Sequence, residues 1–193
     1  MRATLHAVLF LWLALFLSGC RQTYEFKGTT YNPPEAAAEI QGELGGGQRF
    51  RLSDLKGDVV VIFFGYTNCP DICPLTLAEI NKVYEQLGAK ATHLKTVFVS
   101  IDPERDGPEK MEAYVHAFNP DFYGVYISPD ALKQVEADYY VVAQKEAVNG
   151  DSYFMAHTGW LYIIDRQGNL RVLHSAESSA ADLAADIGYL LAN

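Results

Sequence analysis

The stretch Val59-Val60-Val61-Ile62-Phe63-Phe64-Gly65-Tyr66-Thr67-Asn68-Cys69-Pro70-Asp71-Ile72-Cys73-Pro74, or VVVIFFGYTNCPDICP, decides the fold. Its first six residues are apolar without alternation, which predicts a central strand that is covered on both faces. The apolar residues that follow have helical spacing up to Gly88, a residue typical of helix ends; they are Leu75, Leu77, Ile80, Val83, Tyr84 and Leu87. Cys69 and Cys73 are therefore expected at the junction between a buried strand and a helix.

Strands and helices alternate along the rest of the chain. Strand candidates lie at residues 93–101, 123–127, 140–145, 153–155, 159–164 and 170–174, and helix candidates at 109–118, 129–139 and 179–191. The glycines at 45–47 separate residues 38–40 from residues 50–52 as a hairpin turn does. This order predicts an α/β fold, a three-layer sandwich. A dithiol at the end of the first core strand narrows it to a thioredoxin-like sandwich with an N-terminal hairpin extension.

The N-terminus has the pattern of an exported lipoprotein. Arg2 precedes an apolar run over residues 7–17, which is typical of an export signal and not of a spanning helix. The sequence LSGC at residues 17–20 resembles the lipobox of bacterial lipoproteins, so Cys20 is expected to carry lipid and anchor the protein to the cell membrane, facing the periplasm or the cell exterior. An ordinary or uncleaved signal with an incidental cysteine is the alternative. The expected organisation is a signal peptide at 1–19, a tether at 20–35 and one domain at 36–193.

The charge of the chain argues against a nucleic-acid partner. Removal of residues 1–19 takes away one basic residue and no acidic one, which leaves 14 Lys and Arg against 24 Asp and Glu, a formal charge of −10. Binding to nucleic acid requires a net basic face that displaces counterions. We therefore expect no nucleic-acid partner.

With Cys20 assigned to lipid, the exported domain holds only Cys69 and Cys73. A disulfide between them would close a ring of five residues and stabilise the fold by only about 2 kcal/mol before strain. A helix N-terminus favours the thiolate over the thiol, and cysteines at i and i+4 can form a disulfide or place two sulfurs on one metal ion. The spacer differs from the two-residue spacer of ordinary thioredoxin-type oxidoreductases. A structural staple, a redox pair and a metal site all remain open.

A metal site needs a further ligand besides two thiolates, and the histidines are the candidates. His93 opens a strand and is interpreted as a surface or packing residue, His116 as a partly buried structural residue, and His174 as a surface residue. His157 lies between two strand-like segments, where a loop could carry it to the sheet edge. It is the favoured third ligand, although spacing alone does not decide between the four histidines.

Three motifs together resemble a known family. The segment 65–74 closely resembles the copper-site motif of the Sco family (SCO1/SenC/PrrC), the membrane-anchored assembly factors of cytochrome c oxidase. Ser100–Asp106 is similar to that family's second signature, and the stretch around His157, followed by residues 161–165 and Gly168, is similar to the third. The resemblance covers about residues 35–191, and its first motif is highly specific.

The resemblance implies a function as well as a fold. Carried over by position, the family's copper ligands fall on Cys69, Cys73 and His157, a set of soft thiolates and an imidazole that suits Cu(I) or Cu(II). The implied protein delivers copper to the binuclear copper site of cytochrome c oxidase subunit II, or prepares the thiols of that site. This implied function is that of a metallochaperone more than that of an enzyme. Other periplasmic copper carriers or thiol reductants are further expected partners.

Two positions depart from the family pattern. Many relatives carry an aspartate directly before the ligand histidine, where this chain has Ala156, and histidine is common where this chain has Asn68. A missing carboxylate beside His157 could loosen the site or change its copper preference. Neither departure removes an expected ligand.

Other functions are compatible with the same pair of cysteines. A copper-independent thiol-disulfide oxidoreductase of exported proteins would use Cys69 and Cys73 as a redox-active pair without His157. A peroxidase is a third possibility, but Thr67 lies one residue too close to Cys69 for that motif. A small α/β domain with an incidental disulfide is the fourth.

Neighbouring residues are interpreted as structural. Tyr66, Trp160 and the phenylalanines at 63–64 could shape a pocket, but core packing is the favoured interpretation for each. Asp102 and Asp106 could form a polar loop near a metal ion or a docking surface, and a solvated turn is the more usual role of such a run.

Overall fold

The computed structural model describes residues 24–149 and 152–193, so the expected signal peptide and Cys20 lie outside the described residues. The main sheet is built from β1 (Thr29–Ala36), β4 (Val59–Gly65), β5 (Leu94–Ser100), β6 (Tyr123–Val125), β9 (Trp160–Ile164) and β10 (Asn169–Ser175). Two separate hairpins pair β2 (Gln41–Leu44) with β3 (Gln48–Arg51), and β7 (Ala143–Asn149) with β8 (Ser152–His157). The helices are α2 (Ile72–Leu87), α3 (Pro108–His116), α4 (Pro129–Asp138) and α5 (Ala180–Ala192).

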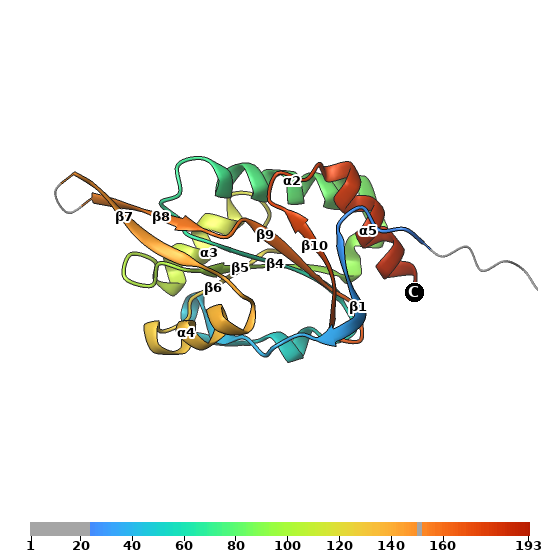
Figure 1. Ribbon diagram of the computed structural model, residues 1–193, viewed down its shortest axis with the longest axis horizontal. Coiled ribbons are helices and arrows are strands. Elements are labelled where there is room, and N and C mark those ends of the chain that lie inside the picture. The colour runs from blue at the N-terminus through green and yellow to red at the C-terminus, as the bar shows by residue number, and fades with distance from the viewer. Residues whose placement is uncertain (1–23, 150–151) are drawn as a thin grey trace, which may run out of the picture.

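The main sheet has the order β1-β10-β9-β4-β5-β6 and separates two layers of helices (Figure 1). Helices α2 and α5 lie on one side of it and α4 lies on the other. Successive side chains of β4 have different partners: the Phe63 ring packs against Phe98 of the neighbouring β5 at 5.6 Å between centroids, and the Phe64 ring packs against Tyr139, which follows α4, at 5.4 Å. The predicted thioredoxin-like three-layer sandwich is confirmed.

Strand β4 is the centre of the core, as its apolar run predicts. All seven residues from Val59 to Gly65 are buried, with β5 parallel on one side and β9 antiparallel on the other. A Cβ atom at Gly65 would lie 2.5 Å from the Phe98 ring and 2.8 Å from Cys73 Sγ. The glycine therefore lets the end of β4 approach the first turn of α2.

The predicted N-terminal hairpin is also present. Strands β2 and β3 pair antiparallel across Gly45–Gly47, where Gly46 and Gly47 have positive φ angles of 71° and 73° that favour glycine. A backbone N–H of β2 donates to the Tyr126 carbonyl at 2.9 Å, which joins the hairpin to the end of β6.

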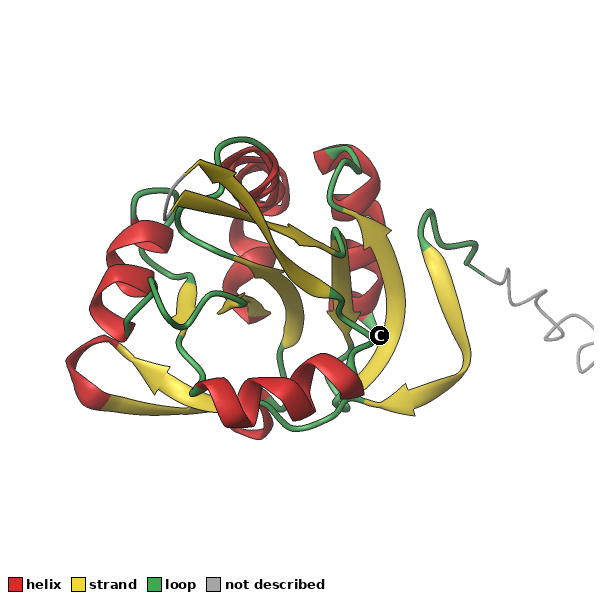
Figure 2. Ribbon diagram, turned by 60° about the vertical axis from the view of Figure 1, so that its left-hand side comes forward, coloured by secondary structure: helices red, strands yellow, loops and turns green. Residues whose placement is uncertain are grey.

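The N-terminal segment differs from the expected tether. Residues 24–36, here called the N-terminal strap, pack onto the domain, and strand β1 within it pairs antiparallel with β10 at the edge of the sheet (Figure 2). The Tyr24 ring stacks on Tyr189 of α5 at 4.1 Å, and its hydroxyl donates to Asp186 Oδ1 at 2.8 Å. Strand β1 is mostly exposed and contains two prolines, so its sequence shows no strand pattern.

Two histidines were misinterpreted from sequence. His174 was expected at the surface but is 2% exposed, and its Nε2 atom lies 2.8 Å from Oδ2 of the fully buried Asp186. His116 was expected to be partly buried but is exposed. Neither belongs to the cluster of potential metal ligands around the cysteine pair. Among residues 24–149 and 152–193, no helix is long and apolar enough to cross a membrane.

Candidate metal site

The two cysteines lie where the sequence places them, between β4 and α2. Helix α2 begins at Ile72, so Cys73 lies in its first turn and Cys69 lies in the loop before it. Cys73 is fully buried, Cys69 is half-buried, and both are free thiols. The backbone N–H of Cys73 donates to Cys69 Sγ at 3.4 Å, a contact that directs the loop sulfur toward the helix N-terminus.

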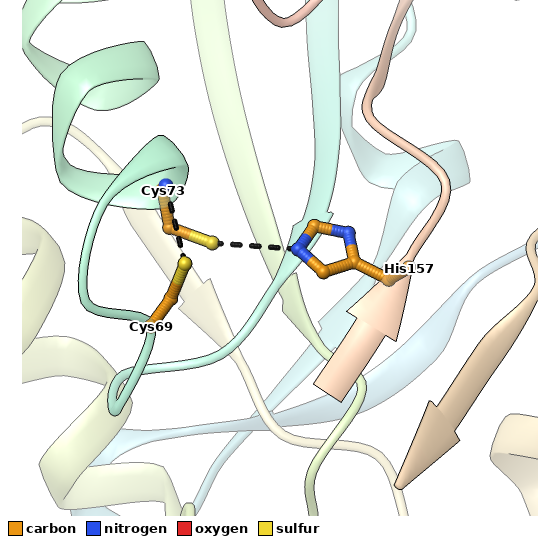
Figure 3. Close-up of side chains that lie close together, drawn as sticks. All are labelled: Cys69, Cys73 and His157. Atoms are coloured by element: carbon orange, nitrogen blue, oxygen red, sulfur yellow. Dashed lines mark hydrogen bonds between the residues drawn. The ribbon is translucent and has the colours of Figure 1, made fainter. Parts of the chain in front are cut away.

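His157 is the last residue of β8, and its ring points at the cysteine pair (Figure 3). Its Nε2 atom lies 3.7 Å from Cys73 Sγ. The two Sγ atoms and a ring nitrogen of His157 lie within 4.8 Å of one another, and this is the one such cluster of potential metal ligands among the described residues. The structure thus brings together the three candidate ligands that the sequence resemblance implies.

The ring orientation of His157 is set by the backbone. Its Nδ1 atom lies 3.1 Å from the Thr158 carbonyl, and because a carbonyl only accepts, Nδ1 carries a proton. Nε2 is the ring nitrogen that faces the cysteines, and it is therefore the one that can bind a metal ion there. A backbone carbonyl commonly supports a metal-binding histidine in this way, so the Thr158 carbonyl gives His157 a supporting acceptor although residue 156 is alanine.

Aromatic side chains form the wall behind this cluster. The rings of Tyr66 and Phe63 lie 6.0 and 6.3 Å from the His157 ring between centroids, and both side chains are buried in the core. Trp160, by contrast, is 41% exposed, so its expected core packing is wrong. The site is therefore dry on the side of Cys73 and accessible on the side of Cys69.

The two thiols have opposite electrostatic environments. The Cys73 thiol, the His157 ring and the backbone N–H groups of Asp71 and Cys73 together lower the pKa of Cys69 to about 4, against the opposing effect of burial. The interaction with Cys69, together with burial, raises the pKa of Cys73. At neutral pH the free pair holds a thiolate at Cys69 beside a thiol at Cys73. A thiolate is the form that binds a soft metal ion or attacks a disulfide.

The acidic residues of the 100–106 motif are not part of a solvated turn. Asp102 and Asp106 are each 1% exposed and accept hydrogen bonds from side chains around the site. Their burial is not evident from sequence because their partners are distant along the chain: Thr67 lies 39 residues before Asp106, and Tyr153 lies 51 residues after Asp102.

Comparison with known proteins agrees with this geometry. The sequence profile described as SCO1/SenC matches residues 44–192, which is most of the chain. The chain belongs to the SCO1/SenC family. The family region begins at the end of β2 and includes the cysteine pair and His157.

Individual relatives support the same assignment. The SCO2-like protein of Rickettsia felis is 35% identical over 63% of this chain, and the match spans only 60% of that relative's length. Apo Sco1 of Thermus thermophilus is 34% identical with a TM-score of 0.75, covering 88% of this chain and 97% of the other. Copper-bound ScoI of Bradyrhizobium japonicum is 34% identical with a TM-score of 0.74, covering 80% and 99%.

Proposed function

We propose that this SCO1/SenC protein binds one copper ion through Cys69, Cys73 and His157. The observation that carries the proposal is the convergence of two sulfurs and the imidazole of His157, whose Nε2 atom faces them, within 4.8 Å. Soft sulfur ligands together with imidazole favour copper over hard cations. Copper bound to ScoI of Bradyrhizobium japonicum, which shares this fold, supports the choice of metal.

The copper ion would be cargo and not a permanent cofactor. Three protein ligands, one of them half-buried at the surface, leave a bound ion open to attack by the ligands of an acceptor. We propose that the acceptor is the binuclear copper site of cytochrome c oxidase subunit II, as the sequence motifs imply. Lipid at Cys20 would hold the domain at the cell membrane, facing the periplasm or the cell exterior.

Oxidation of the pair would switch binding off. When Cys69 and Cys73 form a disulfide, two electrons pass to an oxidant such as the disulfide of another protein, and the anionic thiolates that bind the metal are replaced by neutral, weakly binding sulfurs. Because the two sulfurs already lie within 4.8 Å of each other, this disulfide can form without moving a distant part of the chain.

Titration of the reduced full chain with Cu(I), in competition with a chelator of known affinity, tests the proposal. The reduced protein is expected to bind one equivalent tightly and the disulfide form none. Cys69→Ser, Cys73→Ser and His157→Ala should each lower the affinity sharply, whereas His116→Ala, a matched change at an exposed histidine, should not. Tight one-equivalent binding by the His157→Ala variant would contradict the three-ligand site.

A second candidate function follows from the unequal burial of the two thiols. The half-buried Cys69 could attack a disulfide of an exported protein, and Cys73 could then resolve the mixed disulfide, so that two electrons pass to the substrate and the pair is oxidised. This copper-independent oxidoreductase activity needs only the sulfurs. If His157→Ala loses copper binding yet reduces a disulfide between the copper-site cysteines of subunit II at the wild-type rate, the chain prepares the acceptor site by thiol chemistry.

A further inference from the structure

One short loop contacts both halves of the candidate metal site. Residues 102–106, here called the brace loop, follow β5 and lie between the cysteine loop and the β7–β8 hairpin that carries His157. We propose that Asp106 and Arg105 are positioning residues: Asp106 fixes the cysteine loop, and Arg105 fixes the hairpin. This inference rests on the proposed copper function and assigns to the motif the role of setting the distance between the thiols and the imidazole.

The first arm of the brace loop is a buried carboxylate. Asp106 Oδ2 accepts from the Thr67 backbone N–H at 3.0 Å and from the Ser100 hydroxyl at 2.9 Å. Its Oδ1 accepts from the Thr67 hydroxyl and, at 3.2 Å, from Lys110 Nζ. Thr67 stands two residues before Cys69, so this carboxylate fixes the backbone from which the cysteine loop departs.

The second contact of the brace loop is made by Arg105 with the β7–β8 hairpin. Arg105 donates from Nη1 to the Tyr153 carbonyl at 2.9 Å, and its guanidinium stacks 3.5 Å from the centroid of the Tyr153 ring. The Tyr153 hydroxyl donates to Asp102 Oδ1 at 2.8 Å, and Lys145 pairs with Glu104 at 2.6 Å. Thus the brace loop contacts both strands of the hairpin.

The β7–β8 hairpin is not part of the main sheet, so other contacts must hold it in place. Strands β7 and β8 pair only with each other and share no ladder with the main sheet in the described part of the chain. In Figure 1 they extend away from the body of the domain. Besides its link to β9, which begins at Trp160, the position of His157 therefore depends on contacts such as those of the brace loop and the hydrogen bond from the Met155 N–H to the Tyr66 hydroxyl at 3.2 Å. A functional site held this way loosens when its supporting contacts are removed.

The two arms predict separable effects. Arg105→Met should lower Cu(I) affinity about tenfold or more, as removal of an outer support commonly does, but only while His157 is present. In the His157→Ala background the same change should have no further effect. Thr67→Val removes a hydroxyl from Asp106 and should lower the affinity about tenfold in both backgrounds, while Thr67→Ser should restore it.

A second readout needs no copper. In the reduced apoprotein, amide hydrogen exchange along β7 and β8 should speed up about tenfold in Arg105→Met, because the contacts that hold the hairpin are lost. Arg171→Met is the matched control: Arg171 also pairs with a buried aspartate, Asp165, at 3.0 Å, but at the opposite end of β9 from the site. This control should change neither exchange in the hairpin nor copper affinity.

The two experiments distinguish a failure of the positioning role of the brace loop from a failure of the proposed function. If the wild-type protein does not bind Cu(I), the proposed function is refuted, and hydrogen exchange still tests whether the brace loop holds the hairpin. If Arg105→Met changes neither hydrogen exchange in the hairpin nor Cu(I) affinity, the positioning role of Arg105 is wrong. An equal loss of Cu(I) affinity with and without His157 would also refute it. Where Arg105→Met does not fold, Arg105→Lys serves the same test, because it keeps the charge and loses the stacked guanidinium.

Discussion

The buried Asp186 gives the sharpest prediction about stability. Its carboxylate accepts hydrogen bonds from the Tyr24 hydroxyl, from the backbone N–H groups of Lys27 and Gly28, and from His174, at distances of 2.8 to 3.1 Å. In Asp186→Asn one oxygen becomes an NH₂ group, which cannot accept. If the remaining oxygen keeps the three donors at Oδ2, the Tyr24 hydroxyl still loses its acceptor and every remaining bond loses its charge assistance.

The expected loss can be worked from these contacts. Hydrogen bonds to a charged group contribute about 1.5–3 kcal/mol each, and the exposed end of the strap recovers part of this by hydration once it detaches. We expect Asp186→Asn to lower the free energy of unfolding by about 2–3 kcal/mol, which for a chain of this size is a fall in Tm of about 4–12 °C. Urea denaturation followed by far-UV circular dichroism measures the change.

The matched control is Asp130→Asn, the same chemical change at a carboxylate that is 98% exposed and pairs only with Lys133. It should change the free energy of unfolding by less than about 0.5 kcal/mol. Amide exchange in β1 provides a local readout, because detachment of the strap exposes that strand first. If Asp186→Asn matches the control in urea and leaves exchange in β1 unchanged, the assigned role of this carboxylate is wrong.

Two further predictions concern the cysteine pair itself. Because the pKa of Cys69 is lowered to about 4, its thiolate persists as the pH falls. The rate of Cys69 alkylation by iodoacetamide should therefore stay the same from pH about 8 to about 5. A tenfold loss of rate per pH unit, as for an ordinary thiol of pKa about 8.5, would contradict this. Gly65→Ala would place a methyl group 2.5 Å from the Phe98 ring and 2.8 Å from Cys73 Sγ, and should cost about 1–3 kcal/mol in urea and weaken Cu(I) binding. The control Gly188→Ala, whose nearest contact is 3.4 Å, should be neutral or stabilising by up to about 1 kcal/mol, and equal behaviour of the two variants would rule out the steric argument.

Local patterns predicted the elements that position the site. The apolar run of β4 and the helical spacing after Pro74 required only neighbours in sequence, and both gave the correct element. The strand-to-helix junction then placed Cys69 and Cys73 without further information. His157 was harder, because only its position between two strand-like segments and the family resemblance distinguished it from three other histidines.

The residues that were misinterpreted share a physical cause. Strand β1 is an exposed edge strand, so it has no apolar alternation, and its partner β10 lies far along the chain. His174 and Asp106 are buried polar groups whose burial is permitted by specific partners, Asp186 for the first and Thr67 for the second. Hydrophobic periodicity reports burial of apolar side chains and is silent about polar ones that are satisfied by distant donors.

The docked strap also determines how far the domain could travel from a membrane. A free tether over residues 20–35 would span up to about 50 Å when extended, but the structure fixes the chain from Tyr24 onward, and four peptide steps from Cys20 span at most about 14 Å. If Cys20 carries the proposed lipid, the copper site could therefore reach only a small volume around the point of attachment. Copper exchange would then be confined to a limited range of distances from the bilayer, and encounter with a membrane-bound acceptor would depend on lateral diffusion of both proteins.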